Sequence, residues 1–202
     1  TGMKLSGFVR KSISLLDTPH GFFIMVECGL MDWPCHSNDA ATTIHEVLDF
    51  DAAIGAALDF MKQVIDCTQA LESPLLCGPW FQPVGLFTGT GPTVEEKARA
   101  VEFDRAVAEH ARAAGISLAV EFLNRFEAYF LTTMDGVAEH VKAVGMPNLT
   151  AMFDTFHANI EEDDPAASIR RHRDIITHMH ISETNRGVPG RGHNDWPGIF
   201  KA

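Results

Sequence analysis

Three short apolar runs of the sequence each carry, at or next to their ends, a residue that can bind a metal ion. The candidate ligands are Glu121, Asp154 and His180, in the runs 116–121, 149–154 and 177–181. Two carboxylates and an imidazole form a mixed oxygen and nitrogen donor set, which suits Mn²⁺, Mg²⁺ or Co²⁺ better than a structural zinc ion. Such an ion could hold the carbonyl and hydroxyl oxygens of a substrate while a glutamate moves a proton.

Helical segments with recognisable ends separate these runs. Thr93 and Glu96 have the spacing of a capping box, and Gly145 can take the positive φ that closes a helix. Asp164 followed by Pro165 is a typical helix start. Upstream, apolar residues recur at helical spacing from about residue 51 to 71, and the run 75–77 is expected to be a strand. The alternation predicts successive βα units and a parallel sheet.

The period of two along a strand tests whether the candidate ligands can share one face. If the side chain of Glu121 points into a barrel, those of Ala119 and Ser117 do too, while the branched residues between them face the helices. The same sorting applies to the strands that carry Asp154 and His180. We therefore expect all three side chains at one end of the sheet, where α/β proteins place their chemistry.

The predicted fold is an α/β (β/α)₈ TIM barrel, incomplete in this chain. The 202 residues are fewer than the roughly 250 of a typical barrel. We expect one barrel domain over residues 3–202, with the first strands compressed before residue 50 and the eighth strand absent after Ala202. Thr1 and Gly2, which precede the first Met, are expected to be an expression remnant.

Composition restricts the partners. Twenty-seven acidic residues against sixteen basic ones give a net charge of −11, which disfavours nucleic acid and anionic membranes as partners. The four cysteines form no CxxC pair, and no apolar run of the sequence reaches membrane-spanning length. We expect a cytoplasmic protein that binds a small neutral molecule or a metal cation.

Three strings of the sequence resemble a known family. They are EFLNRFE at 121–127, DTFHANIEE at 154–162 and HMHISETNR at 178–186. Together they resemble the ketose 3-epimerases of the D-tagatose and D-allulose type, which belong to the xylose isomerase-like TIM-barrel superfamily. The resemblance covers about residues 50–200.

The resemblance implies a metal site and a proton-exchange reaction. It assigns Glu121, Asp154 and His180 as metal ligands, together with a glutamate from the eighth strand, and Mn²⁺ is the expected ion, with Mg²⁺ or Co²⁺ as alternatives. Glu121 and the eighth-strand glutamate would invert C3 of a free ketose by proton exchange through a cis-enediolate. No residue after His180 matches that second catalytic glutamate. The family also implies a homodimer or homotetramer.

The resemblance further implies that His157 and Arg186 hold the O1 to O3 region of the sugar and that Glu127 lies in the substrate pocket. Structural alternatives remain for each of these residues. Arg186 could pair with Glu183, Glu127 could pair with Arg125, and His157 could cap the turn after its strand.

Three other functions stay open at this point. One is another sugar isomerase of the same superfamily, of the inosose or hydroxypyruvate type. A second is a metal-assisted hydrolase, which would need a basic groove that the acidic composition disfavours. The third is a metal-binding barrel without catalytic activity.

Overall fold

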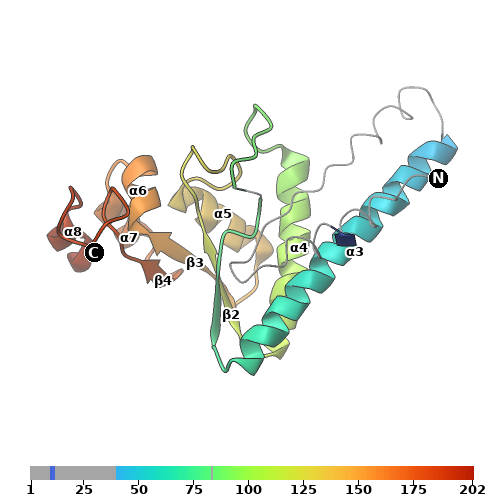
Figure 1. Ribbon diagram of the computed structural model, residues 1–202, viewed down its shortest axis with the longest axis horizontal. Helices are drawn as coiled ribbons and strands as arrows, with labels where there is room; N and C mark the ends of the chain where they lie inside the picture. The colour runs from blue at the N-terminus through green and yellow to red at the C-terminus, as the bar shows by residue number, and fades with distance from the viewer. Residues whose placement is uncertain (1–9, 12–39, 83) are drawn as a thin grey trace. The chain divides into compact units, whose positions relative to one another are not determined.

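The computed structural model describes residues 10–11, 40–82 and 84–202 (Figure 1). The strands expected within residues 3–9 and 22–27 lie outside the described residues. The chain divides into two compact units, Thr1–Val64 and Ile65–Ala202, and all candidate site residues belong to the second. The expected single domain over residues 3–202 stays a prediction.

The second unit contains a four-stranded parallel sheet in the order β1-β2-β3-β4. The strands are β1 (Leu75–Gly78), β2 (Ser117–Glu121), β3 (Leu149–Asp154) and β4 (Ile176–His180). Between or after them come the helices α4 (Val94–Ala113), α5 (Met134–Val144), α6 (Thr155–Glu161), α7 (Pro165–His172) and α8 (Trp196–Lys201). Neighbouring strands that are consecutive in sequence and joined through helices confirm the predicted βα repeats.

The helix ends form as their sequences predict. Thr93 and Glu96 make both hydrogen bonds of a capping box, with the Glu96 N–H on Thr93 Oγ1 at 3.1 Å and the Thr93 N–H on Glu96 Oε2 at 2.7 Å. That backbone hydrogen bond from Thr93 lowers the pKa of Glu96. Gly145 closes α5 with φ of 70°, and Asp164 accepts from the Ala167 N–H at the start of α7. These local signals therefore fix where strands can begin.

Two segments differ from the sequence predictions. Helix α3 (Ala40–Ala70) begins earlier than expected and ends before Leu71, which lies in a turn and is 80% exposed. The chain takes a left-handed φ of 57° at Glu72, so the apolar period cannot continue. Helix α6 was not expected, because seven residues are too few to show a helical period.

The core of the second unit lies between the sheet and the helices that cover it (Figure 1). Helix α4 packs on β2 and α5, and α5 packs on β3 and α7. Branched residues of β2 and β3 are fully buried, and Phe122 and Phe153 meet edge to face at 5.8 Å between ring centroids. Each such side chain contributes about 1.5–3 kcal/mol when buried, so this layer holds the strand ends in place.

An irregularity in β4 sets which of its residues face the site. Ala151 pairs with Ile176, but the next pair is Met152 with His178, which leaves Thr177 as an extra residue on β4. The hydroxyl of Thr177 lies 2.6 Å from that of Thr150 on the neighbouring strand. After the bulge, Asp154 pairs with His180, so both residues reach the end of the sheet together.

Within the described part of the chain, none of the helices combines the length and the apolar character needed to cross a lipid bilayer.

Two glycines around α5 give a test of the helix-end argument. Gly145→Ala should lower the free energy of unfolding by about 1 kcal/mol, because its φ of 70° strains a residue that has a Cβ atom. Gly136→Ala in the same helix is the matched control, with only ordinary contacts for the added Cβ, and should leave stability unchanged or raise it. Chemical denaturation of both variants measures the difference, and an equal effect at the two positions would refute the argument.

Candidate functional site

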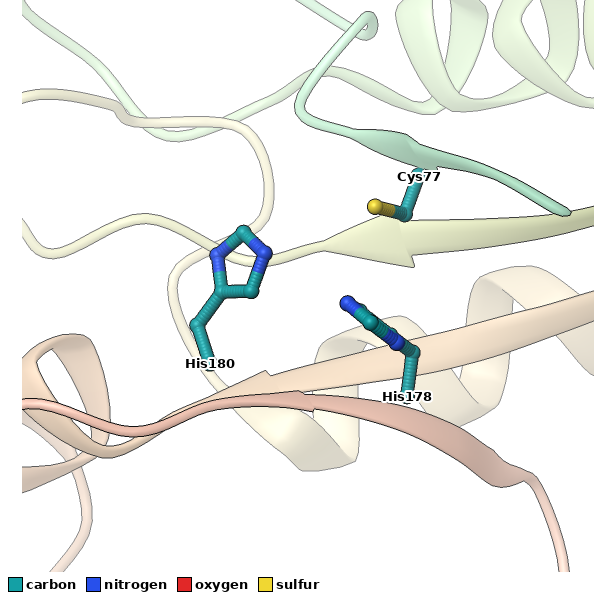
Figure 2. Close-up of side chains that lie close together, drawn as sticks. All are labelled: Cys77, His178 and His180. Atoms are coloured by element: carbon teal, nitrogen blue, oxygen red, sulfur yellow. The ribbon is translucent and has the colours of Figure 1, made fainter. Parts of the chain in front are cut away.

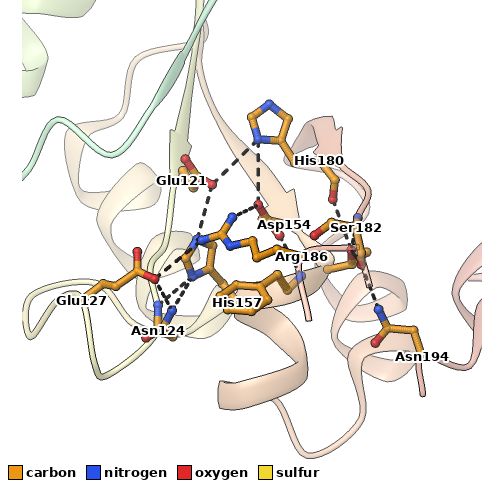
Figure 3. Close-up of polar contacts among 11 residues, drawn as sticks. Glu121, Asn124, Glu127, Asp154, His157, His180, Ser182, Arg186 and Asn194 are labelled. Atoms are coloured by element: carbon orange, nitrogen blue, oxygen red, sulfur yellow. Dashed lines mark hydrogen bonds and ion pairs between the residues drawn. The ribbon is translucent and has the colours of Figure 1, made fainter. Parts of the chain in front are cut away.

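Glu121, Asp154 and His180 are the last residues of β2, β3 and β4. Because the strands are parallel and adjacent, these residues reach the same end of the sheet. His180 Nδ1 lies 3.9 Å from Glu121 Oε1 and 3.9 Å from Asp154 Oδ2 (Figure 3). The three side chains that sequence analysis selected as metal ligands are therefore brought together.

The two carboxylates are buried, whereas the imidazole is half-exposed. Glu121 is 7% and Asp154 2% exposed, while the side chain of His180 is 49% exposed. Burial, and then the nearby charge of Asp154, raise the pKa of Glu121 to about 8. The site thus holds one carboxylate and one carboxyl group that resists ionisation, an arrangement that a bound cation would relieve.

His157 lies in α6 and is 1% exposed. The Asn124 N–H points at its Nδ1 at 3.0 Å. A backbone N–H can only donate, so Nδ1 accepts in this contact, while the Arg186 guanidinium, which also only donates, faces Nε2 at 3.3 Å. A neutral imidazole has one lone pair and can accept only one of these two hydrogen bonds. Burial lowers the pKa of His157, which agrees with a neutral ring. The Nε2 atom of the ring lies 3.8 Å from Glu121 Oε1 (Figure 3).

Arg186 places a positive charge close to the carboxylates of Asp154 and Glu127. Its guanidinium lies 3.7 Å from Asp154 Oδ2 and 3.6 Å from Glu127 Oε1, and it stacks 3.9 Å above the ring of Phe156. It also approaches His157 Nε2 at 3.3 Å. Within the described part of the chain, Arg186 therefore forms its ion pairs with site residues, and the alternative side-chain pair with Glu183 is not formed.

Glu183 instead organises the loop that carries Arg186. It is fully buried and accepts from the Gly190 N–H at 2.6 Å and from the indole N–H of Trp196. The Arg186 N–H donates to the Glu183 carbonyl at 2.9 Å, and Arg186 takes a positive φ of 61°. This hydrogen-bonded loop fixes the position from which the guanidinium reaches the site.

Glu127 faces the site rather than Arg125. Its Oε1 accepts from the Asn124 side-chain amide at 2.9 Å, whereas Arg125 pairs with Glu161 at 3.0 and 3.1 Å. Asn124 is 1% exposed and touches both Glu127 and His157, yet sequence reasoning gave it no role. The only available signal was its place inside the string at 121–127.

The donor set fits a divalent cation. It consists of two buried carboxyl groups on adjacent strands, whose mutual repulsion a positive ion would remove, and an imidazole that opens toward solvent. A second set of potential ligand atoms, those of Glu121, Asp154 and His157, also lie within 4.8 Å of one another. Around such an ion, Arg186, His157 and Glu127 present donors and an acceptor to any molecule bound there.

Comparison with known proteins defines the class. The family described as xylose isomerase-like TIM barrel matches residues 19–202, and the chain belongs to this family. This match confirms the predicted barrel class. The relatives described next confirm the resemblance to ketose 3-epimerases.

A D-psicose 3-epimerase of Enterocloster bolteae is 35% identical over 152 residues, which are 74% of this chain and 50% of that protein. A D-psicose 3-epimerase of Ruminiclostridium cellulolyticum is 42% identical over 113 residues, or 54% of this chain and 39% of that one. A solved L-ribulose 3-epimerase is 33% identical with a TM-score of 0.71, over 74% of this chain and 50% of that chain. The chain spans about half the length of the curated relatives it matches.

The buried carboxyl of Glu121 predicts a pH dependence of stability in metal-free protein. Its pKa rises from 4.5 to about 8 on folding, so the folded state retains a proton that the unfolded state loses, and stability should fall as pH rises through this window. In Glu121→Gln, the decrease in the free energy of unfolding over this pH range should be smaller than in wild type by roughly 1 kcal/mol or more.

The measurement is urea denaturation at pH 5 and pH 8 after removal of metal by a chelator. Glu109→Gln is the matched control, because Glu109 is exposed on α4 and should leave the wild-type pH dependence unchanged. If the free energy of unfolding changed equally between pH 5 and pH 8 in wild type and in Glu121→Gln, Glu121 would be shown to ionise normally.

Proposed function

We propose that the protein is a divalent-metal-dependent epimerase of a free ketose, which inverts C3 by proton exchange. The observation that carries this proposal is the convergence of Glu121, Asp154 and His180 at one end of the sheet, with His180 Nδ1 3.9 Å from a carboxylate oxygen of each partner. Relatives named as 3-epimerases of D-psicose and L-ribulose support the substrate class.

We assign Glu121, Asp154 and His180 as the metal ligands, with Mn²⁺ as the expected ion and Mg²⁺ or Co²⁺ as alternatives. His157 is equally close to Glu121 but is unsuited to ligation. We assign its Nδ1 lone pair to the Asn124 N–H, which leaves a proton and not a lone pair on Nε2. In this tautomer the 3.3 Å approach of the Arg186 guanidinium to Nε2 is not a hydrogen bond. A divalent ion at the assigned site would supply positive charge opposite the sugar oxygens that become negative during proton removal.

The remaining side chains would position the sugar and move the proton. Glu121, at the buried end of β2, exchanges the proton at C3. Arg186 and the Nε2–H of His157 donate to oxygens near C1 to C3, and Glu127, oriented by Asn124, accepts from a hydroxyl. Inversion requires proton removal from one face and delivery to the other, so a second base is needed. Only the Glu121 half of that pair is assigned here, because the chain spans about half of its relatives.

A free sugar fits the charge of the chain better than a phosphorylated one, because the net charge of −11 repels phosphate. A solved relative, a D-allulose 3-epimerase from Methylomonas sp. in complex with D-allulose, is 29% identical with a TM-score of 0.71, over 75% of this chain and 52% of that chain, and supports this choice. Another isomerisation within the superfamily is the alternative. A homodimeric or homotetrameric assembly and a cytoplasmic location stay predictions.

Glu121→Gln should abolish C3 epimerisation, with a loss of roughly 100-fold or more, because an amide cannot accept the proton. Circular dichroism should show an unchanged fold, and Glu109→Gln should retain wild-type activity. The assay follows interconversion of D-fructose, D-allulose and D-tagatose by chromatography. Unchanged turnover in Glu121→Gln would remove the catalytic assignment.

Asp154→Asn should weaken Mn²⁺ binding about tenfold or more, because it replaces a charged ligand by a neutral one. Isothermal titration calorimetry on metal-stripped protein measures the affinity. Asp174→Asn is the control, since the side chain of Asp174 is 95% exposed and lies outside the site. Equal affinities for the two variants would contradict the metal assignment.

A further inference from the structure

A second group of potential ligands lies beside the carboxylate site. The ligand atoms of Cys77, His178 and His180 all lie within 4.8 Å of one another. Figure 2 shows the thiol on one strand facing the two imidazoles across the concave side of the sheet. None of the functional assignments above uses Cys77 or His178.

Sheet curvature brings these residues together. Cys77 belongs to β1 and the histidines to β4, the two outer strands of the sheet. Three strand spacings would separate them by about 14 Å in a flat sheet. Their convergence to within 4.8 Å therefore requires that the sheet bends and that all three side chains point to its inner side. Cys77 pairs with Ala119, two residues before Glu121, which fixes this orientation.

The donor set differs in kind from the neighbouring one. A thiolate and two imidazoles favour Zn²⁺ and other soft ions, whereas the carboxylate site favours Mn²⁺ and Mg²⁺. Donor atoms around one tetrahedral zinc lie about 3.3–3.8 Å apart, given bonds of about 2.0–2.3 Å. Small side-chain rotations from separations within 4.8 Å would suffice to close the group around an ion.

His180 belongs to both groups. A neutral imidazole offers a single lone pair, because its other nitrogen carries the proton. His180 can therefore ligate an ion beside Glu121 and Asp154 or an ion beside Cys77 and His178, but not both at once.

We propose that Cys77, His178 and His180 form a thiophilic cation site whose occupation by Zn²⁺ or a similar soft ion withdraws His180 from the carboxylate site. The existence of this site is independent of the proposed epimerase activity. Only its effect on the neighbouring ion rests on the assignment of His180 made above.

The first test detects the thiolate bond directly. Metal-stripped protein is titrated with Cd²⁺ while the ultraviolet thiolate-to-metal charge-transfer absorption is recorded. A variant with Ser at positions 28, 35 and 67 keeps Cys77 as its sole thiol and should give the full band at one equivalent. Cys77→Ser should lose that band, and His178→Ala should weaken Cd²⁺ binding about tenfold or more.

The matched control is Cys67→Ser, because Cys67 is exposed on α3 and outside the group. It should leave the titration unchanged. A missing band in the sole-thiol variant, or an unchanged band in Cys77→Ser, would overturn the proposal. Should the triple variant fail to fold, the difference between wild type and Cys77→Ser decides the question.

The second test measures the competition. Zn²⁺ is added to protein loaded with Mn²⁺, and released Mn²⁺ is followed by electron paramagnetic resonance. Wild type should release Mn²⁺ at about one equivalent of Zn²⁺, and Cys77→Ser should require at least about tenfold more. Equal release from both proteins would overturn the shared role of His180. Failure of Mn²⁺ to bind at all would count against the proposed function, while the Cd²⁺ band would still decide the thiophilic site.

Discussion

The repulsion between two buried carboxyl groups at the ends of β2 and β3 is the constraint around which this site is organised. Glu121 and Asp154 cannot both ionise cheaply where they stand, as the raised pKa of Glu121 indicates. Arg186 reduces that cost in part, because its positive charge lies 3.7 Å from Asp154 and lowers the pKa of Glu121. A hydrophobic layer behind the sheet keeps the two strands from moving apart, so the unfavourable proximity persists in the folded protein and is available for binding a cation.

Much of this arrangement could be predicted from the sequence, because it depends on local rules. The ends of α5 and α7 follow from Gly145 and Asp164, and strand alternation places the predicted ligands on one face. The unpredicted parts depend on contacts between distant segments. Asn124 acquires its role only by meeting His157, 33 residues away. Glu183 looks like a rim carboxylate in sequence, yet a folded loop buries it completely. Neither contact has a periodic signal that a sequence could display.

The two histidines near Glu121 illustrate how backbone geometry distinguishes side chains of identical chemistry. His157 and His180 lie at nearly equal distances from the same carboxylate oxygen. The N–H of Asn124 contacts Nδ1 of His157 and the guanidinium of Arg186 faces its Nε2, whereas His180 is half-exposed beside both acids. No composition or spacing argument separates two such histidines. The distinction arises from contacts that the turn after β2 and the loop of Arg186 make with one of the two rings.

The extra residue in β4 makes the geometry of the site depend on a bulge at one point. Thr177 has no partner in the register between β3 and β4, and the residues after it are paired one step later than they would be otherwise. Deletion of Thr177 alone would leave His178 opposite Met152 and His180 opposite Asp154. If Thr177 instead paired regularly with Met152, Met179 would lie opposite Asp154 and both histidines would turn toward the helices. The bulge therefore decides which face of β4 carries the two imidazoles, and a strand of the same length without it would present Thr177 and Met179 to the site.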